Sequence, residues 1–219
     1  MRSFLARLRR GDRSYEPQLQ AAVARLVQPG WTCADVGAHR GVFTRLLAEL
    51  VGEGGRVVAF EAHPDNARRL RRSLPGAVCD RVVVENLAVT DGSTQRVHLH
   101  PGRRHASQEW NVVGADLEGR PTPAELEVAA TSLDAYFAER PLDFVKLDVE
   151  GAEADVLRGM RRLLRDRKPM LAVEFHTERG WAGRSELLEA GYRLGSLGGD
   201  PVDDGPAAKR VYQCLALPS

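Results

Sequence analysis

A few carboxylate, imidazole and glycine residues carry the chemistry that this sequence can perform. Residues 35–41 read Asp-Val-Gly-Ala-His-Arg-Gly and lie between a short apolar run and an apolar-periodic helix. Glu61 follows a second apolar run, residues 57–60. Where one strand ends in a glycine-rich loop and the next ends in a carboxylate, the two ends form a socket for the adenosine half of a nucleotide-like cofactor.

The spacing of the glycines indicates which cofactor fits. The loop reads D-x-G-x-x-x-G and lacks the G-x-G-x-x-G of dinucleotide binders, in which the backbone closely approaches a pyrophosphate. This favours S-adenosylmethionine, which has no phosphate, over NAD. A carboxylate at position 61 can accept hydrogen bonds from both ribose hydroxyls and would repel a 2′-phosphate, which argues against NADP.

The predicted cofactor socket extends along several strand ends. Gly37 permits a positive φ or close ligand approach, and Gly41 lets the following helix lie near the strand. Backbone N–H groups at the start of that helix can bind the methionine carboxylate, which the helix dipole favours. Asp35 can order the loop or bond the amino group through water. The predicted cofactor-binding residues are Asp35, Gly37, Ala38, His39, Gly41, Glu61, Ala62, Asn86, Leu87 and Asp148.

Polar residues also follow two later predicted strands, at the sheet edge where parallel strands place ligands. These residues are the candidates for catalysis of methyl transfer.

The methyl group on the sulfonium of S-adenosylmethionine is already activated, so the enzyme mainly has to position the acceptor. Such positioning is worth about 10⁵–10⁸ M in effective molarity. A hydroxyl is a poor nucleophile, and a base adds roughly 10²–10⁴-fold. His176, with a reference pKa of about 6.5, is the candidate base. Asp148 and Glu150 are the rival base or a substrate clamp.

A divalent ion is the alternative to a base. Asp148, Glu174 and His176 could hold an ion that lowers the pKa of the acceptor hydroxyl. Two carboxylates and an imidazole suit Mn²⁺ or Zn²⁺ better than Mg²⁺. We do not expect a metal to be needed and keep these three residues as the alternative ligands.

The elements that must position these residues alternate between apolar runs and helical periodicity. Parallel strands linked by helices imply a mostly parallel sheet covered on both faces. Helices are predicted over residues 17–27, 42–50 and 186–190, from Pro64 to Leu74, and as one helix from Gly151 to Pro169. Strands are predicted over residues 32–36, 57–60, 81–89, 95–100, 127–131, 143–149, 170–175, 192–197 and 211–217. Residues 101–125 form a long insertion, and such loops are usually functional.

Five sequence blocks resemble the FkbM family of S-adenosylmethionine-dependent methyltransferases, in the same order and spacing over residues 30–176. They are Val36-Gly-Ala-His-Arg-Gly41, Phe60-Glu-Ala-His-Pro64, Leu87-Ala-Val-Thr-Asp91, Thr131-Ser-Leu-Asp134 and Val145-Lys-Leu-Asp-Val-Glu-Gly-Ala-Glu153. The last block is the most specific. His39 and Ala62 stand where the family commonly has Asn and Pro.

The resemblance implies a class I Rossmann-like α/β fold, with a seven-stranded mostly parallel sheet, helices on both faces and a C-terminal antiparallel hairpin. It also implies O-methylation of a sugar or natural-product hydroxyl. We expect one methyltransferase domain over residues 1–219, with an N-terminal helical segment at 1–28 and an active-site loop or lid at 101–125. Carboxyl or N-methylation, or a non-catalytic nucleoside-binding module, are the alternative functions.

Charge, cysteine spacing and the distribution of apolar residues indicate which kinds of partner this protein has. The formal net charge is +1, so no bulk field favours nucleic acid. Three widely spaced cysteines argue against a disulfide framework or a zinc site. The basic N-terminus lacks the apolar segment of a signal peptide, and no apolar run is long enough to span a bilayer. We therefore expect a cytoplasmic enzyme with a small-molecule acceptor and no membrane or nucleic-acid partner, and leave an oligomer open.

Overall fold

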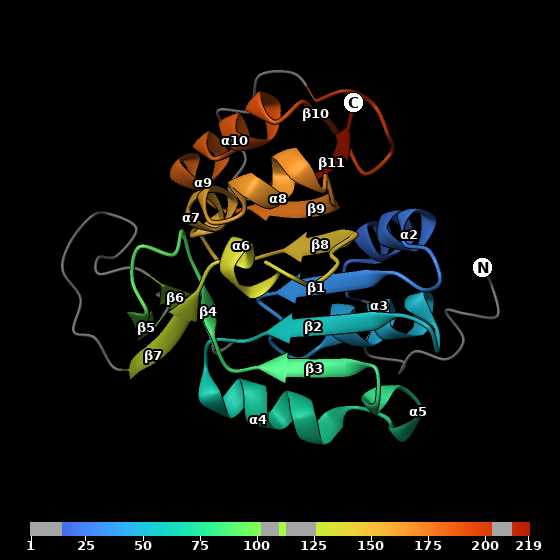
Figure 1. The fold of residues 1–219 in the computed structure, drawn as a ribbon, viewed down its shortest axis with the longest axis vertical. Coiled ribbons are helices and arrows are strands. Elements are labelled where there is room, and N and C mark those ends of the chain that lie inside the picture. The colour runs from blue at the N-terminus through green and yellow to red at the C-terminus, as the bar shows by residue number, and fades with distance from the viewer. Residues whose placement is uncertain (1–14, 102–109, 113–125, 203–211) are drawn as a thin grey trace.

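A seven-stranded sheet lies at the centre of the computed structural model, which describes residues 15–101, 110–112, 126–202 and 212–219 (Figure 1). Five neighbouring strands are parallel, and the C-terminal strand runs antiparallel between two others. The strand order is β10 (Tyr192–Gly195), β11 (Tyr212–Pro218), β9 (Met170–Phe175), β8 (Phe144–Leu147), β1 (Thr32–Val36), β2 (Arg56–Phe60) and β3 (Val82–Glu85). The predicted α/β architecture with its C-terminal antiparallel pair is confirmed.

Two hydrophobic cores cover the faces of this sheet, because successive side chains of a strand point to opposite faces. On β1, Ala34 and Val36 belong to the core under α6 (Leu133–Tyr136), α7 (Glu153–Arg158), α8 (Arg161–Asp166) and α10 (Arg184–Glu189). Cys33 belongs to the core under α2 (Pro17–Leu26) and α3 (Val42–Val51). Helix α4 (Pro64–Ser73) packs on β2 and β3 through a third cluster. The described residues also form two short helices, α5 (Gly76–Cys79) and α9 (Glu178–Ala182).

A second, four-stranded sheet lies beyond the carboxyl ends of the parallel strands, to the left in Figure 1. Its order is β4 (Ala88–Val89), β7 (Leu126–Thr131), β5 (Arg96–Pro101) and β6 (Trp110–Val112). The prediction of one strand over residues 81–89 is wrong, because β3 and β4 belong to different sheets. The side chain of Asn86 lies between them and bonds the chain after β2, so the strand cannot continue.

The single helix predicted after Gly151 is also divided, into α7 and α8. Gly159 lies between them, where an added Cβ would come within 2.0 Å of the Thr90 carbonyl oxygen. The Asp134 carboxylate accepts hydrogen bonds from the backbone N–H groups of Arg162 and Leu163, both at 2.9 Å, and so caps the start of α8. Contacts with other elements therefore interrupt a stretch whose apolar periodicity is continuous.

The two predicted accessory segments are only partly covered by the described residues. Helix α2 lies within the predicted N-terminal segment, whose residues 1–14 lie outside the described part of the chain. Most of the predicted lid at 101–125 also lies outside it, and there the structure gives only the backbone pairing of β6 with β5. Among the described helices, none combines the length and apolarity needed to cross a membrane.

Candidate functional site

The ends of β1, β2 and β8 meet because the three strands are in register. Val36 pairs with Phe60 on one side and with Leu147 on the other. The next residues along each strand are therefore brought to the same edge of the sheet. Figure 1 shows these strand ends facing the smaller sheet. The predicted site residues consequently gather here in two neighbouring groups, one around Glu61 and one around His176.

Gly37 is required by contact between two strand ends. Its φ is +84°, and an added Cβ would lie 1.7 Å from the Asp148 carbonyl oxygen. Gly41 has φ +75°, and its Cβ would lie 2.2 Å from Leu70 Cδ1 of α4. Gly37 thus has the positive φ that the sequence analysis allowed for, Gly41 has a positive φ as well, and the close approach at each is to the protein itself.

Glu61 is held by backbone groups of two loops. Its Oε2 accepts a hydrogen bond from the His39 N–H at 2.7 Å, and its Oε1 accepts one from the His63 N–H at 2.9 Å. Burial raises the pKa of this carboxyl group, although the two N–H donors act in the opposite direction. The Asn66 side chain donates a third hydrogen bond to this carboxylate. A ligand can bond the carboxylate at its remaining lone pair or in place of Asn66.

Asn86 fixes the backbone that carries Glu61. Its Nδ2 donates to the carbonyl oxygens of Glu61 at 2.9 Å and Ala62 at 2.8 Å. Leu87, the next residue, packs against the larger core, and Ala38 is buried in the cluster under α4. Hydrogen bonds from Asn86, which follows β3, therefore hold the predicted cofactor residues Glu61 and Ala62, which follow β2.

Asp35 is fully buried and contacts the helix that follows the loop. Its Oδ2 accepts a hydrogen bond from the Thr44 hydroxyl at 2.5 Å, which ties β1 to α3. Burial raises the pKa of this carboxyl group, and the nearby Lys146 ammonium opposes the shift. Of the two roles predicted for Asp35, this geometry supports the ordering of the loop.

Lys146 is a site residue that the sequence analysis missed. Its Nζ lies 2.6 Å from Asp148 Oδ2 and 4.8 Å from the centre of the Phe43 ring. Burial alone would lower its pKa, but the carboxylates of Asp148 and Asp35 outweigh that effect and raise it. A lysine inside the otherwise apolar strand β8 was the signal that could have identified it, because buried lysines are almost always paired.

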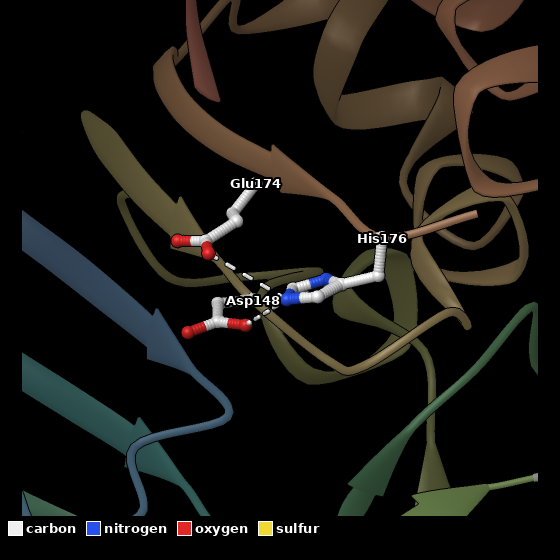
Figure 2. Close-up of side chains that lie close together, drawn as sticks. All are labelled: Asp148, Glu174 and His176. Carbon is white, nitrogen blue, oxygen red and sulfur yellow. Dashed lines mark ion pairs between the residues drawn. The ribbon is translucent and has the colours of Figure 1, made fainter. Parts of the chain in front are cut away.

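His176 lies among four carboxylates. Its Nδ1 is 2.9 Å from Glu153 Oε1. Its Nε2 is 3.5 Å from Asp148 Oδ1, and Figure 2 shows the Asp148 and Glu174 carboxylates turned toward this edge of the ring. Glu174 Oε1 and Glu150 Oε2 are each 3.6 Å from the same Nε2. Burial alone would lower the pKa of His176, but the carboxylates of Glu153, Asp148 and Glu150 outweigh burial and raise it to about 9.

Glu153 and Gln213 support this cluster from outside. Glu153 is fully buried, and its Oε1 also accepts a hydrogen bond from the Gly151 N–H at 2.8 Å. Gln213 Nε2 of the antiparallel strand β11 donates to Glu174 Oε2 at 3.0 Å. The sequence analysis assigned no role to Glu153, and Gln213 could not be identified from sequence because it comes from the distant C-terminal strand.

Glu16, the residue immediately before helix α2, adds a further acidic group. Burial, together with the negative charge of Glu174, raises the pKa of Glu16 to about 7. Its Oε2 is buried and has no hydrogen-bond partner among the described residues. The start of α2 therefore approaches the same cluster, which the sequence did not predict.

Asp148 links the two groups of residues. Its backbone carbonyl contacts the loop of Gly37, and its side chain faces His176. The structure thus brings together Asp148, Glu150, Glu174 and His176 on one side and places the Glu61 group on the other. A cofactor bound at Glu61 and an acceptor bound at His176 would lie next to each other.

Residues 35–194 match the model of the Methyltransferase FkbM domain. The 2-O-methyltransferase NoeI of Sinorhizobium fredii is 25% identical over an alignment 177 residues long, which covers 75% of this chain and 71% of that enzyme. The methyltransferase FkbM of Methylobacillus flagellatus has a similar structure, with a TM-score of 0.55 and 16% identity. That match covers 99% of this chain and 57% of the other.

Fibrillarin of Aeropyrum pernix, solved with natively bound S-adenosylmethionine, has a TM-score of 0.53 and 14% identity over 90% of this chain and 73% of its own. These structural matches show the class I methyltransferase fold. Because the FkbM model spans the loop at Gly37, Glu61 and the strand that precedes His176, the match includes both groups of site residues. The chain belongs to the FkbM family of methyltransferases.

Proposed function

We propose that this methyltransferase transfers the methyl group of S-adenosylmethionine to a hydroxyl group of a small molecule, such as a sugar or a natural-product intermediate. The observation that carries this proposal is the position of Asp148, whose backbone contacts the glycine loop while its side chain faces His176. A methyl donor on one side and a hydroxyl acceptor on the other can therefore be held in line.

The donor would bind beside Glu61. The backbone N–H groups of His39 and His63 fix the carboxylate, which can then accept hydrogen bonds from the two ribose hydroxyls. The remaining proposed cofactor contacts are Asp35, Gly37, Ala38, Gly41, Ala62, Asn86, Leu87 and the backbone of Asp148. Of these, Asp35 and Asn86 position the loops through Thr44 and the carbonyl oxygens after β2.

The acceptor would bind at the cluster around His176. The acceptor oxygen attacks the methyl carbon, the bond between that carbon and the sulfonium sulfur breaks, and the sulfur becomes a neutral thioether. The hydroxyl proton must pass to a group in the site. Asp148 and Glu150 are the proposed proton acceptors, because Asp148 Oδ1 and Glu150 Oε2 lie 3.5 and 3.6 Å from His176 Nε2 at this point. His176 is a proposed acceptor only in its neutral form, because the surrounding carboxylates favour its protonated form.

The charge of the cluster favours a neutral hydroxylated acceptor. Asp148, Glu150, Glu153 and Glu174 together would repel a carboxylate acceptor, and equally the phosphates of a nucleic acid. Carboxylates are also suitable acceptors for the hydrogen bonds of sugar hydroxyls. The name of NoeI, a 2-O-methyltransferase, supports the same chemistry for this family.

The test combines cofactor binding with methyl transfer. Calorimetry should show that the wild-type chain binds S-adenosylmethionine and that Glu61→Ala removes most of the binding. Glu85→Ala is the matched control, because Glu85 ends the next strand but bonds the Tyr136 hydroxyl at 2.7 Å. With S-adenosylmethionine carrying a labelled methyl group, we expect label in hydroxylated acceptors and none in analogues whose hydroxyls are blocked.

Three outcomes would contradict the proposal. A wild-type chain that does not bind S-adenosylmethionine overturns the assignment of the cofactor. Binding without transfer to any of a broad panel of acceptors favours the non-catalytic module. Transfer to a carboxylate that survives in His176→Ala favours carboxyl methylation, which needs no base.

A further inference from the structure

Three side chains of the acceptor site converge on one point. The ligand atoms that Asp148, Glu174 and His176 can offer all lie within 4.8 Å of one another. Asp148 Oδ1 and Glu174 Oε1 approach His176 Nε2 to 3.5 and 3.6 Å, as the dashed lines in Figure 2 show. These separations exceed those of ordinary hydrogen bonds, which are about 2.7–3.2 Å. The contacts are therefore long ion-pair contacts rather than hydrogen bonds, and a divalent cation between the three atoms would replace them.

The opposite atom of each of these side chains is held by another residue. Lys146 binds Asp148 Oδ2 at 2.6 Å, and Gln213 binds Glu174 Oε2 at 3.0 Å. The buried Glu153 binds His176 Nδ1 at 2.9 Å. A carboxylate on the far nitrogen of a histidine is the usual outer partner of a metal-ligating imidazole, because it fixes the tautomer and orients the ring. The outer contacts thus leave Oδ1, Oε1 and Nε2 as the inward-facing atoms.

The distances from His176 Nε2 to the two inward carboxylate oxygens suit ligands of one divalent ion. Metal–ligand bonds of about 2.0–2.2 Å in a tetrahedral arrangement place the ligand atoms roughly 3.4 Å apart. The distances of 3.5 and 3.6 Å are close to this value. Glu150 Oε2, also 3.6 Å from Nε2, is a fourth oxygen near the same point.

We propose that Asp148, Glu174 and His176 form a binding site for one divalent cation of the Mn²⁺ or Zn²⁺ class. The donor set of two carboxylate oxygens and one imidazole nitrogen suits these ions better than Mg²⁺, which prefers oxygen ligands and retained water. The sequence alone favoured a site without metal and kept this triad as the alternative. The outer contacts of Lys146, Gln213 and Glu153 are the observation that favours the triad.

The role of the ion rests on the proposed function, but its binding does not. A bound divalent cation lowers the pKa of a coordinated hydroxyl and orients it. It would also neutralise part of the charge of the surrounding carboxylates. Three protein ligands leave coordination positions open for an acceptor oxygen, as in catalytic metal sites.

The test measures metal binding to the full chain without cofactor or acceptor. Protein treated with a chelator is equilibrated by dialysis with MnCl₂ or ZnSO₄, and bound metal is counted by elemental analysis. We expect one ion per wild-type chain. Glu174→Gln and Asp148→Asn should each weaken the affinity at least about tenfold, and Glu153→Gln should weaken it about tenfold through the orientation of His176.

Glu127→Gln is the control, because Glu127 is half-exposed on β7 of the smaller sheet and pairs with Arg96 rather than with any residue of the triad. Retained binding of S-adenosylmethionine shows that each variant is folded. The metal site is overturned if wild-type protein holds no stoichiometric ion at millimolar metal, or if Glu174→Gln and Asp148→Asn bind as tightly as wild type. Methyl transfer that persists in metal-free protein overturns the catalytic role of the ion and leaves the proposed function standing.

Discussion

Glu153 Oε1 lies 2.9 Å from His176 Nδ1, so a residue in the first turn of α7 orients the imidazole that follows β9. The same oxygen accepts a hydrogen bond from the Gly151 N–H. Glu153 thereby joins the loop after β8 to the chain after β9. The shape of the acceptor site depends on this buried carboxylate, although Glu153 does not face the acceptor itself.

Removing the Glu153 carboxylate should destabilise the protein. Glu153→Ala leaves the Gly151 N–H and His176 Nδ1 without a partner in a buried place, and we expect a loss of about 2–3 kcal/mol in the free energy of unfolding. Glu153→Gln should lose less, because the amide oxygen can still accept. Urea denaturation measures both. Glu127→Ala, which removes a half-exposed ion pair, should change the free energy by only about 0–1 kcal/mol. Equal losses for the two alanine variants would contradict this view.

Gly37 and Gly30 form a matched pair of glycines with positive φ, +84° and +86°. Gly37→Ala adds a Cβ that collides with the Asp148 carbonyl oxygen, whereas nothing lies within 4 Å of a Cβ at position 30. We expect Gly30→Ala to cost roughly 1–2 kcal/mol from backbone strain alone. Gly37→Ala should cost more than about 3 kcal/mol and also weaken cofactor binding. Thermal denaturation and calorimetry compare them, and equal effects would refute the proposed contact between strand ends.

The affinity for S-adenosylmethionine should depend on the protonation of Glu61. Ribose hydroxyls donate to the ionised carboxylate, so cofactor binding favours the charged form, and protonation at low pH weakens it. Because burial raises the pKa of Glu61 above the ordinary value of 4.5, the weakening should begin at a higher pH than for an exposed glutamate. Below the pKa, Kd should rise up to about tenfold per pH unit.

Calorimetric titrations from pH 8 to pH 5 measure this effect. Glu61→Gln, which cannot ionise, should bind more weakly at pH 8 and lose the part of the pH dependence that Glu61 causes. An identical pH profile for wild type and Glu61→Gln would show that the carboxylate does not take part in binding.

Asp134 should contribute to stability without affecting the site. Asp134→Ala removes two capping hydrogen bonds from the start of α8, and we expect a loss of about 1–2 kcal/mol. Ser132→Ala removes the single 3.2 Å cap of α6 and should cost less. Urea denaturation ranks the two variants. A change in the affinity for S-adenosylmethionine in Asp134→Ala would argue that α8 is coupled to the cofactor site.

Much of the site could be predicted from sequence because strand ends in a parallel sheet share one edge. The apolar runs before Gly37, Glu61 and Asp148 were enough to place these residues together, once a parallel sheet was expected. The outer partners could not be predicted in this way. Lys146 acts through a side chain inside a strand, and Gln213 comes from an antiparallel strand near the C-terminus, so neither follows a strand end.

The sequence by itself determined the alternation of strands and helices along the chain, the glycine at position 37 that permits a positive φ, and the family, because these follow from local periodicity and from short motifs. Tertiary contacts decided where those elements stop. Asn86 ends β3, and Asp134 and Gly159 divide the helix after Gly151, since each makes contacts with residues distant in the chain. Tertiary structure alone also gave His176 its four carboxylate neighbours, because their charges interact only when β8, β9 and α7 pack together.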